Sequence, residues 1–382
     1  GNIEDGDGCS SICVFEDGWS CTGGACIPEA PRVTSAKVVF NKKTTDRLSA
    51  VSLGDNRAFI TYMDADNKNR GMAITASMKN GELVFGSGTV FNPSPTTDPS
   101  GMVVTTIDDS TAVIAYHDDE SNTCRALVAS VQDEEILIGE AVEFAPSPCL
   151  GELSIAALSP TTIVVTYNGG EYPFAGYLSI GEIDLQQKSI RFTEAQEYLA
   201  SPASFVSMVP LGPNRFVLNY PDEERPMQGN AHLVTWDGSA ITFGTKQQFT
   251  ASGALAIESV GLNESQWVTA FLDASSLPPQ AVVILGQIKD NSTIEFSEKH
   301  SFAQRAATYS LTAIPPYRFS VAYQDFDDNN KGKVVLGNVS LDGEMTLGTG
   351  STFHHGQVAG STGQGQITSA LLNEETEIMV FS

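Results

Sequence analysis

Basic residues are scarce in this chain. Only 21 lysines and arginines stand against 46 aspartates and glutamates, which gives a formal net charge of −25 at neutral pH. Such a surface repels phosphate backbones and anionic lipid headgroups, so nucleic acid is not an expected partner. Long apolar runs are also missing, because none approaches the roughly 18 to 20 residues of a membrane helix. We therefore expect no direct membrane insertion.

Cysteine is sparse outside a short N-terminal segment. Four of the six cysteines lie in the first 26 residues: Cys9, Cys13, Cys21 and Cys26. This segment has too few apolar residues to form a core, so it predicts a small disulfide-rich module over residues 1–30. A zinc site is the weaker interpretation, because the segment has no C-x-x-C pair and no nearby histidine.

Most of the chain consists of one repeat. An aromatic residue closes a strand-like segment at intervals of 51 to 54 residues, at Phe40, Phe91, Phe144, Tyr198, Phe249, Phe302 and Phe353. A second aromatic series keeps the same period, at Tyr62, Tyr116, Tyr167, Tyr220, Phe271, Tyr323 and Phe381. Five members of this second series are followed two residues later by aspartate. In four repeats a glycine lies five residues before the closing aromatic and predicts a bulge: Gly86, Gly139, Gly244 and Gly348.

Each repeat has room for four short strands. In the first repeat they are expected over residues 47–53, 57–63, 71–78 and 82–91, with turn residues between them. Four antiparallel strands in about 50 residues are typical of a propeller blade. A solenoid is the alternative, but its terminal units differ from the rest, whereas these repeats look equivalent. The predicted fold class is all-β, a seven-bladed β-propeller of four-stranded blades over residues 31–382.

The two ends of the repeat region predict a ring closure. Residues 32–40 match the outermost strand of a blade whose other strands lie at the C-terminus, so we expect them to close the last blade. The last repeat supplies only two inner strands. Either this blade has three strands, or its third strand comes from sequence beyond Ser382 or from another molecule.

The N-terminal segment carries a specific motif. The run Gly6-Asp7-Gly8-Cys9-Ser10-Ser11-x-Cys13, followed by Glu16, Gly18, Trp19 and Cys21, resembles the myxobacterial-type cysteine-rich repeat. The resemblance covers about the first 26 residues. It implies a non-catalytic spacer of the kind found in large extracellular and cell-surface proteins, including pappalysin-like proteins outside their protease. The rest of the chain resembles secreted propellers with a repeated Y-x-D signature, and the combination is similar to components of protist surface fibres.

Two turns place oxygen ligands at alternate positions before a glycine, as calcium loops do. Their candidate ligands are Asp64, Asp66, Asn67 and Asn69 in the first turn, and Asp325, Asp327, Asp328 and Asn330 in the second. Neither turn has the glutamate that completes an EF-hand loop, and Asp and Asn favour such turns for backbone reasons alone. Calcium is the one candidate cofactor, and ordinary polar turns are the alternative.

Glycosylation sequons and the two remaining cysteines indicate a secreted protein. Three sequons fall at predicted turns or strand ends, beginning at Asn263, Asn291 and Asn338. Cys124 and Cys149 lie at comparable levels of adjacent repeats, which predicts a disulfide between neighbouring blades; two free buried thiols are the alternative. Together these features predict the secretory pathway and an extracellular or cell-surface location.

Enzyme motifs are absent. The chain has no G-x-S-x-G, no H-E-x-x-H, no phosphate-binding loop and no Asp box of sialidases. Glu152 and Glu258 fall near innermost strands, where a glycoside-cleaving propeller would need two convergent carboxylates. His117 and the pair His354 and His355 fall in predicted loops and are interpreted as exposed turn residues. We therefore expect no catalytic activity.

The sequence as a whole predicts a non-catalytic extracellular structural or adhesive glycoprotein module. In this hypothesis it is a subunit of a surface fibre, filament or matrix, and its partners are copies of itself or other extracellular proteins. A lectin-like propeller that binds glycans between its blades is the alternative, and a glycoside-cleaving enzyme is the third interpretation.

Overall fold

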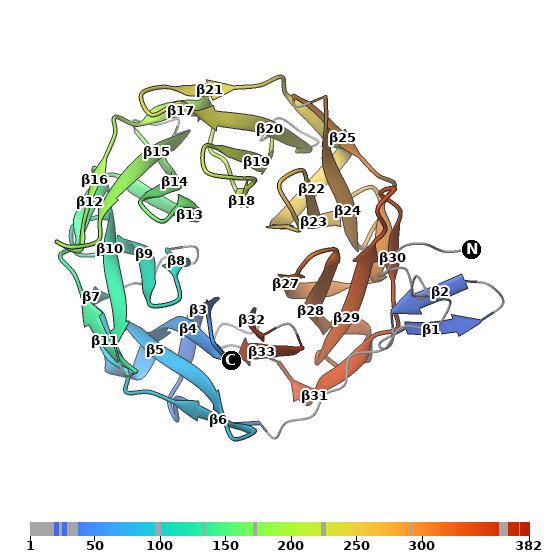
Figure 1. The fold of residues 1–382 in the computed structure, drawn as a ribbon, viewed down its shortest axis with the longest axis horizontal. Helices are drawn as coiled ribbons and strands as arrows, with labels where there is room; N and C mark the ends of the chain where they lie inside the picture. Colours follow the sequence, from blue (N-terminus) through green and yellow to red (C-terminus); the bar gives the residue numbers. More distant parts are fainter. Residues whose placement is uncertain are drawn as a thin grey trace.

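The computed structural model describes residues 19–22, 25–28, 37–95, 101–132, 134–170, 174–222, 227–290, 292–358, 366–373 and 375–382. In this part of the chain, strands alternate with short turns and with two single 3-10 turns, η1 (Ala65–Asn67) and η2 (Phe326–Asp328). No helix here is long and apolar enough to span a membrane. The antiparallel sheets surround a common centre (Figure 1), so the predicted all-β propeller class is confirmed.

Successive strands of a sheet follow one another outward from the centre, as β8, β9 and β10 do in Figure 1. The innermost strands are β3 (Thr45–Gly54), β8 (Met102–Asp108), β13 (Cys149–Ser159), β18 (Ser207–Pro210), the second half of β22 (Gln247–Gly261), β27 (Ala306–Ile314) and β32 (Ile367–Asn373). The second strands are β4 (Arg57–Asp64), β9 (Thr111–Asp118), β14 (Thr162–Gly169), β19 (Arg215–Pro221), β23 (Gln266–Asp273), β28 (Arg318–Asp325) and β33 (Thr376–Phe381). We number the blades 1 to 7 in this order.

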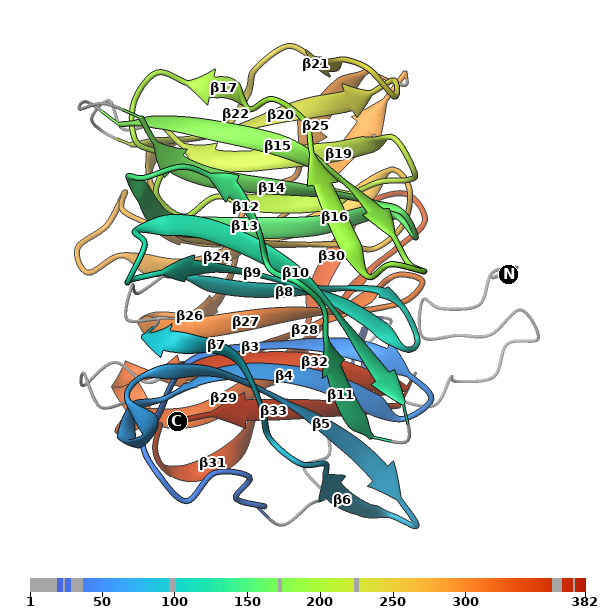
Figure 2. The same cartoon turned by 90° about the vertical axis from the view of Figure 1, so that its left-hand side faces the viewer.

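Blades 1 to 6 continue with a third strand and an outer strand in two pieces (Figure 2). The third strands are β5 (Arg70–Lys79), β10 (Thr123–Gln132), β15 (Ala175–Asp184), β20 (Gln228–Trp236), β24 (Gln280–Lys289) and β29 (Lys331–Val339). The outer pieces are β6 (Glu82–Phe85) and β7 (Thr89–Pro95), β11 (Glu135–Ile138) and β12 (Val142–Ala145), β16 (Ser189–Phe192) and β17 (Gln196–Leu199), β21 (Ile241–Phe243) and the first half of β22, β25 (Thr293–Phe296) and β26 (His300–Ala303), and β30 (Met345–Leu347) and β31 (Ser351–Gln357).

The break in each outer strand explains the predicted glycine bulges. Gly86 lies between β6 and β7, and its N–H donates to the Thr75 carbonyl of β5 at 3.0 Å. Gly139 makes the same bond to Val128 in blade 2 at 2.8 Å. A Cβ on Gly86 would overlap the Thr75 side chain. The bulge is therefore confirmed, and the position requires a residue without a side chain.

The two aromatic series meet between the blades. Each closing aromatic packs against the second-series aromatic of the following blade, with ring centroids 5.2 to 5.8 Å apart. The pairs are Phe40–Tyr62, Phe91–Tyr116, Phe144–Tyr167, Tyr198–Tyr220, Phe249–Phe271, Phe302–Tyr323 and Phe353–Phe381. The sequence period is thus the spacing of one contact repeated around the ring, and the apolar core lies between adjacent sheets.

The chain ends meet at blade 7. The prediction of a strand over residues 32–40 is wrong for residues 37–40, which form no strand. Residues 32–36 lie outside the described residues. Phe40 nevertheless packs on Tyr62 of blade 1, and Lys37 Nζ lies 5.2 Å from the Phe381 ring centroid in blade 7. Within the described residues, β32 and β33 are the strands of blade 7.

The predicted N-terminal module is described only in part. β1 (Trp19–Thr22) and β2 (Ala25–Pro28) form an antiparallel pair in which Cys21 stands opposite Cys26. Cys9 and Cys13 lie outside the described residues. The disulfide pairing of this segment therefore stays a prediction.

Candidate functional site

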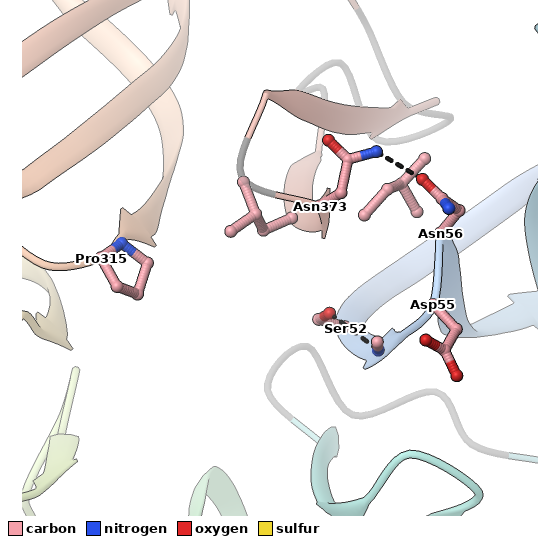
Figure 3. A pocket seen from close by; sticks show the side chains of 8 residues that line it. Ser52, Asp55, Asn56, Pro315 and Asn373 are labelled. Atoms are coloured by element: carbon pink, nitrogen blue, oxygen red, sulfur yellow. Dashed lines mark hydrogen bonds between the residues drawn. The ribbon is translucent and has the colours of Figure 1, made fainter.

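A pocket of about 410 Å³ lies where the inner hairpins of blades 6, 7 and 1 turn (Figure 3). Its lining residues are Ser52, Gly54, Asp55, Asn56, Pro315, Leu371, Leu372 and Asn373. The Asn373 amide donates to the Asn56 side chain, and the Asn56 N–H donates to the Leu372 carbonyl at 3.2 Å. Among these eight residues Asp55 is the one with a charged side chain. The pocket therefore does not supply the pair of carboxylates that glycoside cleavage needs.

The two carboxylates singled out in the sequence serve two different blade junctions. Glu152 Oε2 accepts the Phe205 N–H at 3.0 Å and so joins blade 3 to blade 4. Glu258 Oε1 accepts the Leu311 N–H at 2.9 Å and joins blade 5 to blade 6. Each carboxylate thus satisfies a backbone donor of the next innermost strand or of the loop before it, which is a structural role.

The position of Glu258 is one of a repeated set. In the sheet register it stands opposite the residue just before the second-series aromatic, as do Ser207, Ser310 and Thr368. Each of these side chains accepts a backbone N–H from the following blade. The bonds are Ser259 N–H to Ser207 at 2.9 Å, Ser369 N–H to Ser310 at 3.2 Å, and Ala50 N–H to Thr368 at 3.1 Å. We call this set the junction acceptors; Glu258 is the charged member.

Burial raises the pKa of Glu258 to about 7, although the Leu311 N–H and the Ser310 hydroxyl oppose the shift. The residue as a whole keeps partial exposure, but its carboxyl group is enclosed between blades 5 and 6. A carboxyl in such surroundings gains or loses its proton near neutral pH. This property also occurs at catalytic sites, but a second convergent carboxylate is needed for general acid and base chemistry on a glycoside.

A second buried carboxylate was not predicted from the sequence. Glu377 of β33 accepts the Ser320 hydroxyl of β28, with Oγ–Oε distances of 2.7 and 2.8 Å. Burial raises the pKa of Glu377, and hydrogen bonds from Ser320, Thr312 and Ser369 oppose that shift. This contact joins blades 6 and 7.

Both members of this pair replace apolar residues. Glu377 lies four residues before the second-series aromatic, where the other blades bury Ala58, Ala112, Ile163, Phe216, Trp267 and Phe319. Ser320 lies three residues before it, where the others bury Phe59, Val113, Val164, Val217, Val268 and Ile378. The signal in the sequence was a polar residue at each of two positions that are apolar in the other six repeats. That these two polar residues form a pair becomes clear only from the structure, in which the two positions face each other across a blade junction.

Hydroxyl groups connect the two carboxylates. Ser310 donates to Glu258 at 3.2 Å, and Ser369 lies 3.3 Å from Ser310 and 2.6 Å from Thr312. A hydrogen-bonded network thus extends from blade 5 through blade 6 to blade 7. Because every member lies between sheets, the network holds the blades in register rather than facing a ligand.

The second predicted calcium turn is filled by cations of the chain itself. Lys333 Nζ lies 2.7 Å from Asp325 Oδ2 and 3.0 Å from Asp328 Oδ2, and Lys331 Nζ lies 2.8 Å from Asp328 Oδ1. Asp327 pairs with Arg305 at 3.5 Å. Ammonium groups of the chain thus already neutralise the carboxylates that would bind the ion, and calcium binding at this turn stays a prediction.

The first predicted calcium turn also behaves as a backbone turn. Asp66 accepts the Thr44 N–H at 3.3 Å, and Lys68 and Asn69 adopt left-handed conformations with φ of 62° and 57°. In the second turn the corresponding residues, Asn329 and Asn330, have φ of 55° and 59°. No group of three or more His, Cys, Asp or Glu side chains suited to a metal occurs in the described part of the chain. The backbone conformations of both loops are those of ordinary polar turns, the alternative to calcium sites.

Three of the five aspartates of the repeated Y-x-D signature share a structural role. Asp118, Asp273 and Asp325 each accept the backbone N–H two residues later, at 2.9 to 3.2 Å. Each also pairs with a basic side chain: Arg125 at 3.7 Å, Lys299 at 2.7 Å and Lys333 at 2.7 Å. The signature therefore ends the second strand and fixes the following turn.

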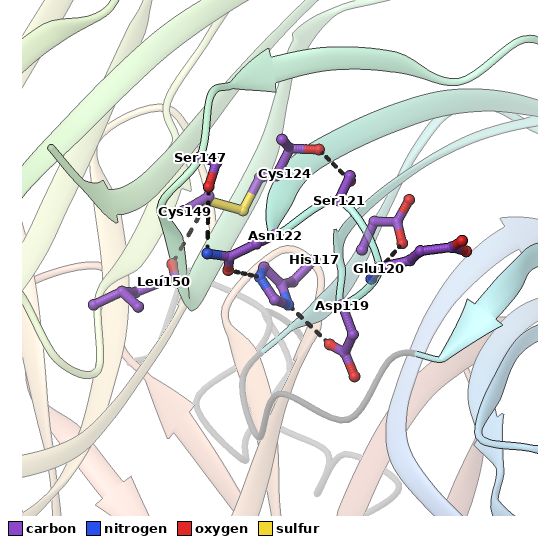
Figure 4. Close-up of polar contacts among 11 residues, drawn as sticks. His117, Asp119, Glu120, Ser121, Asn122, Cys124, Ser147, Cys149 and Leu150 are labelled. Carbon is purple, nitrogen blue, oxygen red and sulfur yellow. Dashed lines mark hydrogen bonds and ion pairs between the residues drawn. A yellow bond between two sulfur atoms is a disulfide. The ribbon is translucent and has the colours of Figure 1, made fainter.

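The predicted inter-blade disulfide is present. Cys124 of β10 in blade 2 and Cys149 of β13 in blade 3 are bonded, with Cα atoms 5.7 Å apart (Figure 4). The adjacent His117 is 7% exposed, so its interpretation as an exposed turn residue is wrong. Its ring nitrogens lie 3.0 Å from Asp119 Oδ1 and 3.1 Å from Asn122 Oδ1.

The histidine pair lies in a strand rather than in the predicted loop. His354 and His355 belong to β31 in the outer strand of blade 6. The His354 ring packs against Phe381 of blade 7, with centroids 4.8 Å apart. His355 is exposed. The contact of His354 is with an aromatic ring of the next blade, which is a packing role.

The three sequons differ in accessibility. Asn338 lies near the end of β29 and is 4% exposed, so the fold disfavours a glycan there, and glycosylation at this position stays a prediction. Asn263 lies half-buried in the turn between β22 and β23, where its amide donates to Gln266 Oε1 at 2.9 Å. Asn291 lies outside the described residues.

Comparison with known proteins supports the fold. No protein-family model and no curated protein matches the chain. Its structure is similar to the periplasmic gluconolactonase of Pseudomonas aeruginosa, with a TM-score of 0.57, 10% identity, and coverage of 84% of this chain and 88% of that one. A putative 6-phosphogluconolactonase of Bacteroides fragilis gives a TM-score of 0.53 at 12% identity, covering 85% and 86%. A protein from Lactobacillus plantarum gives 0.56 at 12% identity, covering 81% and 85%.

At these identities the likeness shows the fold alone. The chain is a β-propeller. Unrelated functions occur on this fold, so the fold alone does not determine the activity.

Proposed function

We propose that this chain is a non-catalytic structural or adhesive module of an extracellular fibre, filament or matrix, built on a seven-bladed propeller. The observation that carries the proposal is that the inner carboxylates Glu152 and Glu258 each accept a backbone N–H at a different blade junction. A glycoside-cleaving propeller would instead need two carboxylates that converge on one site.

Apolar exposure beside blade 7 supports the same conclusion. Val38 is 44% exposed and Val39 is 58% exposed, and both precede Phe40, which packs on blade 1. Valines exposed on a protein surface favour coverage by another protein.

The carboxylates support a non-catalytic role. Glu152 and Glu258 bond to backbone donors of different blades, and Glu377 bonds to Ser320. The pocket at the inner hairpins of blades 6, 7 and 1 has Asp55 as its charged side chain. The lectin alternative calls for exposed aromatics at one repeated position. Both repeated aromatic series instead pack against each other between blades.

An extracellular location is the setting that fits the disulfide. Cys124 and Cys149 are both fully buried and bonded between two blades. Structural disulfides of this kind persist in oxidising compartments and are rare in the cytosol.

Immunogold electron microscopy of the native cells tests this proposal. Antibodies against the folded chain should label a fibre or matrix outside the cell, and the isolated material should form ordered assemblies. Label confined to the cell interior, or recovery of the protein only as free particles of 40.7 kDa, would overturn the proposal.

A further inference from the structure

Two asparagines of the chain are followed by glycine, Asn80 and Asn168. Such a pair is chemically labile, because glycine has no Cβ to keep its backbone nitrogen away from the asparagine side chain. The fold places the two pairs in opposite surroundings. These surroundings decide which of the two asparagines reacts.

Asn80 and Gly81 form the tip of the hairpin between β5 and β6. Lys79 pairs with Glu82, so the turn has two residues. Asn80 has a φ of 54° and Gly81 a φ of 81°, as a type I′ turn requires. Both residues are exposed, and a Cβ on Gly81 would meet nothing within 4 Å. In the part of the chain that the structure describes, the Asn80 carboxamide has no hydrogen-bond partner.

Asn168, by contrast, is held in place within β14, where it is 4% exposed. Its Nδ2 donates to the Ala203 carbonyl at 3.1 Å, and its Oδ1 accepts the Ala203 N–H at 2.9 Å. Gly169 stands between Cys149 of β13 and Ala175 of β15 in the sheet. The carboxamide would have to lose both bonds, and the sheet would have to open, before this pair could react. The fold therefore protects Asn168.

We propose that the Asn80–Gly81 turn is a site of spontaneous deamidation. The backbone nitrogen of Gly81 attacks Cγ of Asn80 and forms a C–N bond, the bond from Cγ to Nδ2 breaks, and the displaced NH2 group leaves with the Gly81 proton as ammonia. Water then opens the cyclic imide at either carbonyl, which leaves aspartate or isoaspartate at position 80. Water is the co-reactant, and nothing is oxidised or reduced. The modified fraction therefore increases with the age of the protein.

The modification affects the junction between blades 1 and 2. Lys79, beside the turn, pairs with Glu134 of blade 2, and the Ser77 hydroxyl donates to the same carboxylate at 3.0 Å. A new carboxylate at position 80 competes with Glu134 for the Lys79 ammonium. Isoaspartate also adds a methylene to the backbone of a two-residue turn, so the register of Lys79 with Glu82 is lost. The β5–β6 end of the blade should loosen.

Incubation of the folded full chain at pH 8, followed by peptide mapping with mass spectrometry, tests the site. Conversion shows as the mass change of NH replaced by O, and an isoaspartyl-specific methyltransferase labels the isoaspartate form. Asn80 should convert at least tenfold faster than Asn168. In urea the fold no longer protects Asn168, so the two rates should come within about threefold of each other.

Asn80→Gln is the matched control, because glutamine would have to form a larger and less favourable ring. The wild type and this variant are incubated side by side. Hydrogen exchange of the β6 amides should rise in the incubated wild type and stay unchanged in the variant. Circular dichroism before incubation checks that the two proteins have the same fold.

Three results would overturn the inference: equal conversion of Asn80 and Asn168 in the folded chain, no conversion at Asn80, or a tenfold difference that persists in urea. In the last case the flanking residues, and not the fold, would set the rate. The site is independent of the structural role proposed above, so neither result decides the other.

Discussion

Among single side chains, Glu258 and Glu377 differ most from their repeat equivalents. One replaces a hydroxyl that accepts a backbone N–H in other blades, and the other replaces a buried apolar residue. Both are accommodated by hydroxyl donors from the neighbouring blade. Because burial raises the pKa of each carboxyl, the stability of the junctions around blade 6 depends on pH.

Glu258→Gln should remove part of this pH dependence. The folded chain holds a proton on Glu258 up to about pH 7, whereas the unfolded chain releases it near the ordinary carboxyl pKa. The free energy of unfolding therefore falls as pH rises through this window. The glutamine keeps an oxygen for the Leu311 N–H and does not titrate. Since the residue keeps partial exposure, we expect the variant to gain about 1–2 kcal/mol relative to wild type between pH 5 and pH 8.

Urea unfolding at several pH values measures this difference. Glu377 also has a raised pKa, so Glu258→Gln should reduce the slope and not abolish it. Parallel stability curves for the two proteins between pH 5 and pH 8 would contradict the assignment.

The Ser320–Glu377 contact should show strong coupling. Ser320→Ala removes a donor from a buried carboxylate and should cost about 1–3 kcal/mol at pH 8. The combined change of Ser320→Val and Glu377→Leu restores the apolar pair of the other junctions, so its stability should lie within about 1 kcal/mol of wild type or above it. A double-mutant cycle of Ser320→Val and Glu377→Leu, measured by urea unfolding, gives the coupling energy of the contact. Simple additivity of the two single changes would count against the contact.

At the level of strands, third strands are constrained by the rings that pack on their glycines. Gly337 of β29 lies beneath the Phe319 ring of β28, and a Cβ there would overlap that ring. In the sequence Gly337 is one of 34 glycines, and nothing there indicates that it packs against Phe319. The structure shows that the small residue and the large one belong to neighbouring strands of one blade.

Gly337→Ala should therefore destabilise the protein by about 1–3 kcal/mol through overpacking. The matched control is Gly350→Ala, because a Cβ on Gly350 meets its nearest neighbour at an ordinary 3.5 Å. Phe319→Leu combined with Gly337→Ala should recover part of the loss. Thermal unfolding followed by circular dichroism compares the four proteins, and equal losses for the two alanine variants would exclude this packing argument.

The strands were predictable to the extent that their residues repeat. Two aromatic series with one period were enough for the number and order of the strands, and a glycine before four of the closing aromatics located the bulge in those blades. The register across a junction left no trace in one sequence, so the meeting of Ser320 and Glu377 was not foreseen. The ion pairs at the second candidate calcium turn were missed for a related reason: Lys331 and Lys333 follow Asp325 closely in sequence, but only the fold directs their ammonium groups onto its turn.

Across the ring as a whole, the aromatic contacts repeat at all seven junctions. Within the described residues, one junction also contains a disulfide. Cys124 and Cys149 lie within the apolar cluster between blades 2 and 3, together with Phe144 and Tyr167. The other junctions remain closed without a covalent bond. The disulfide therefore adds to a junction that already has the common packing, and its removal should weaken that junction first.

Cys124→Ala with Cys149→Ala tests this expectation without reducing the N-terminal cysteines. The bond closes a loop with a sequence separation of 25, for which chain entropy indicates a loss of about 2–4 kcal/mol. Hydrogen exchange should rise first in β9, β10, β13 and β14, while β23 and β28 keep the protection of the wild type. Uniform loss of protection in all blades would mean that the ring unfolds as one unit and that the junctions are not independent.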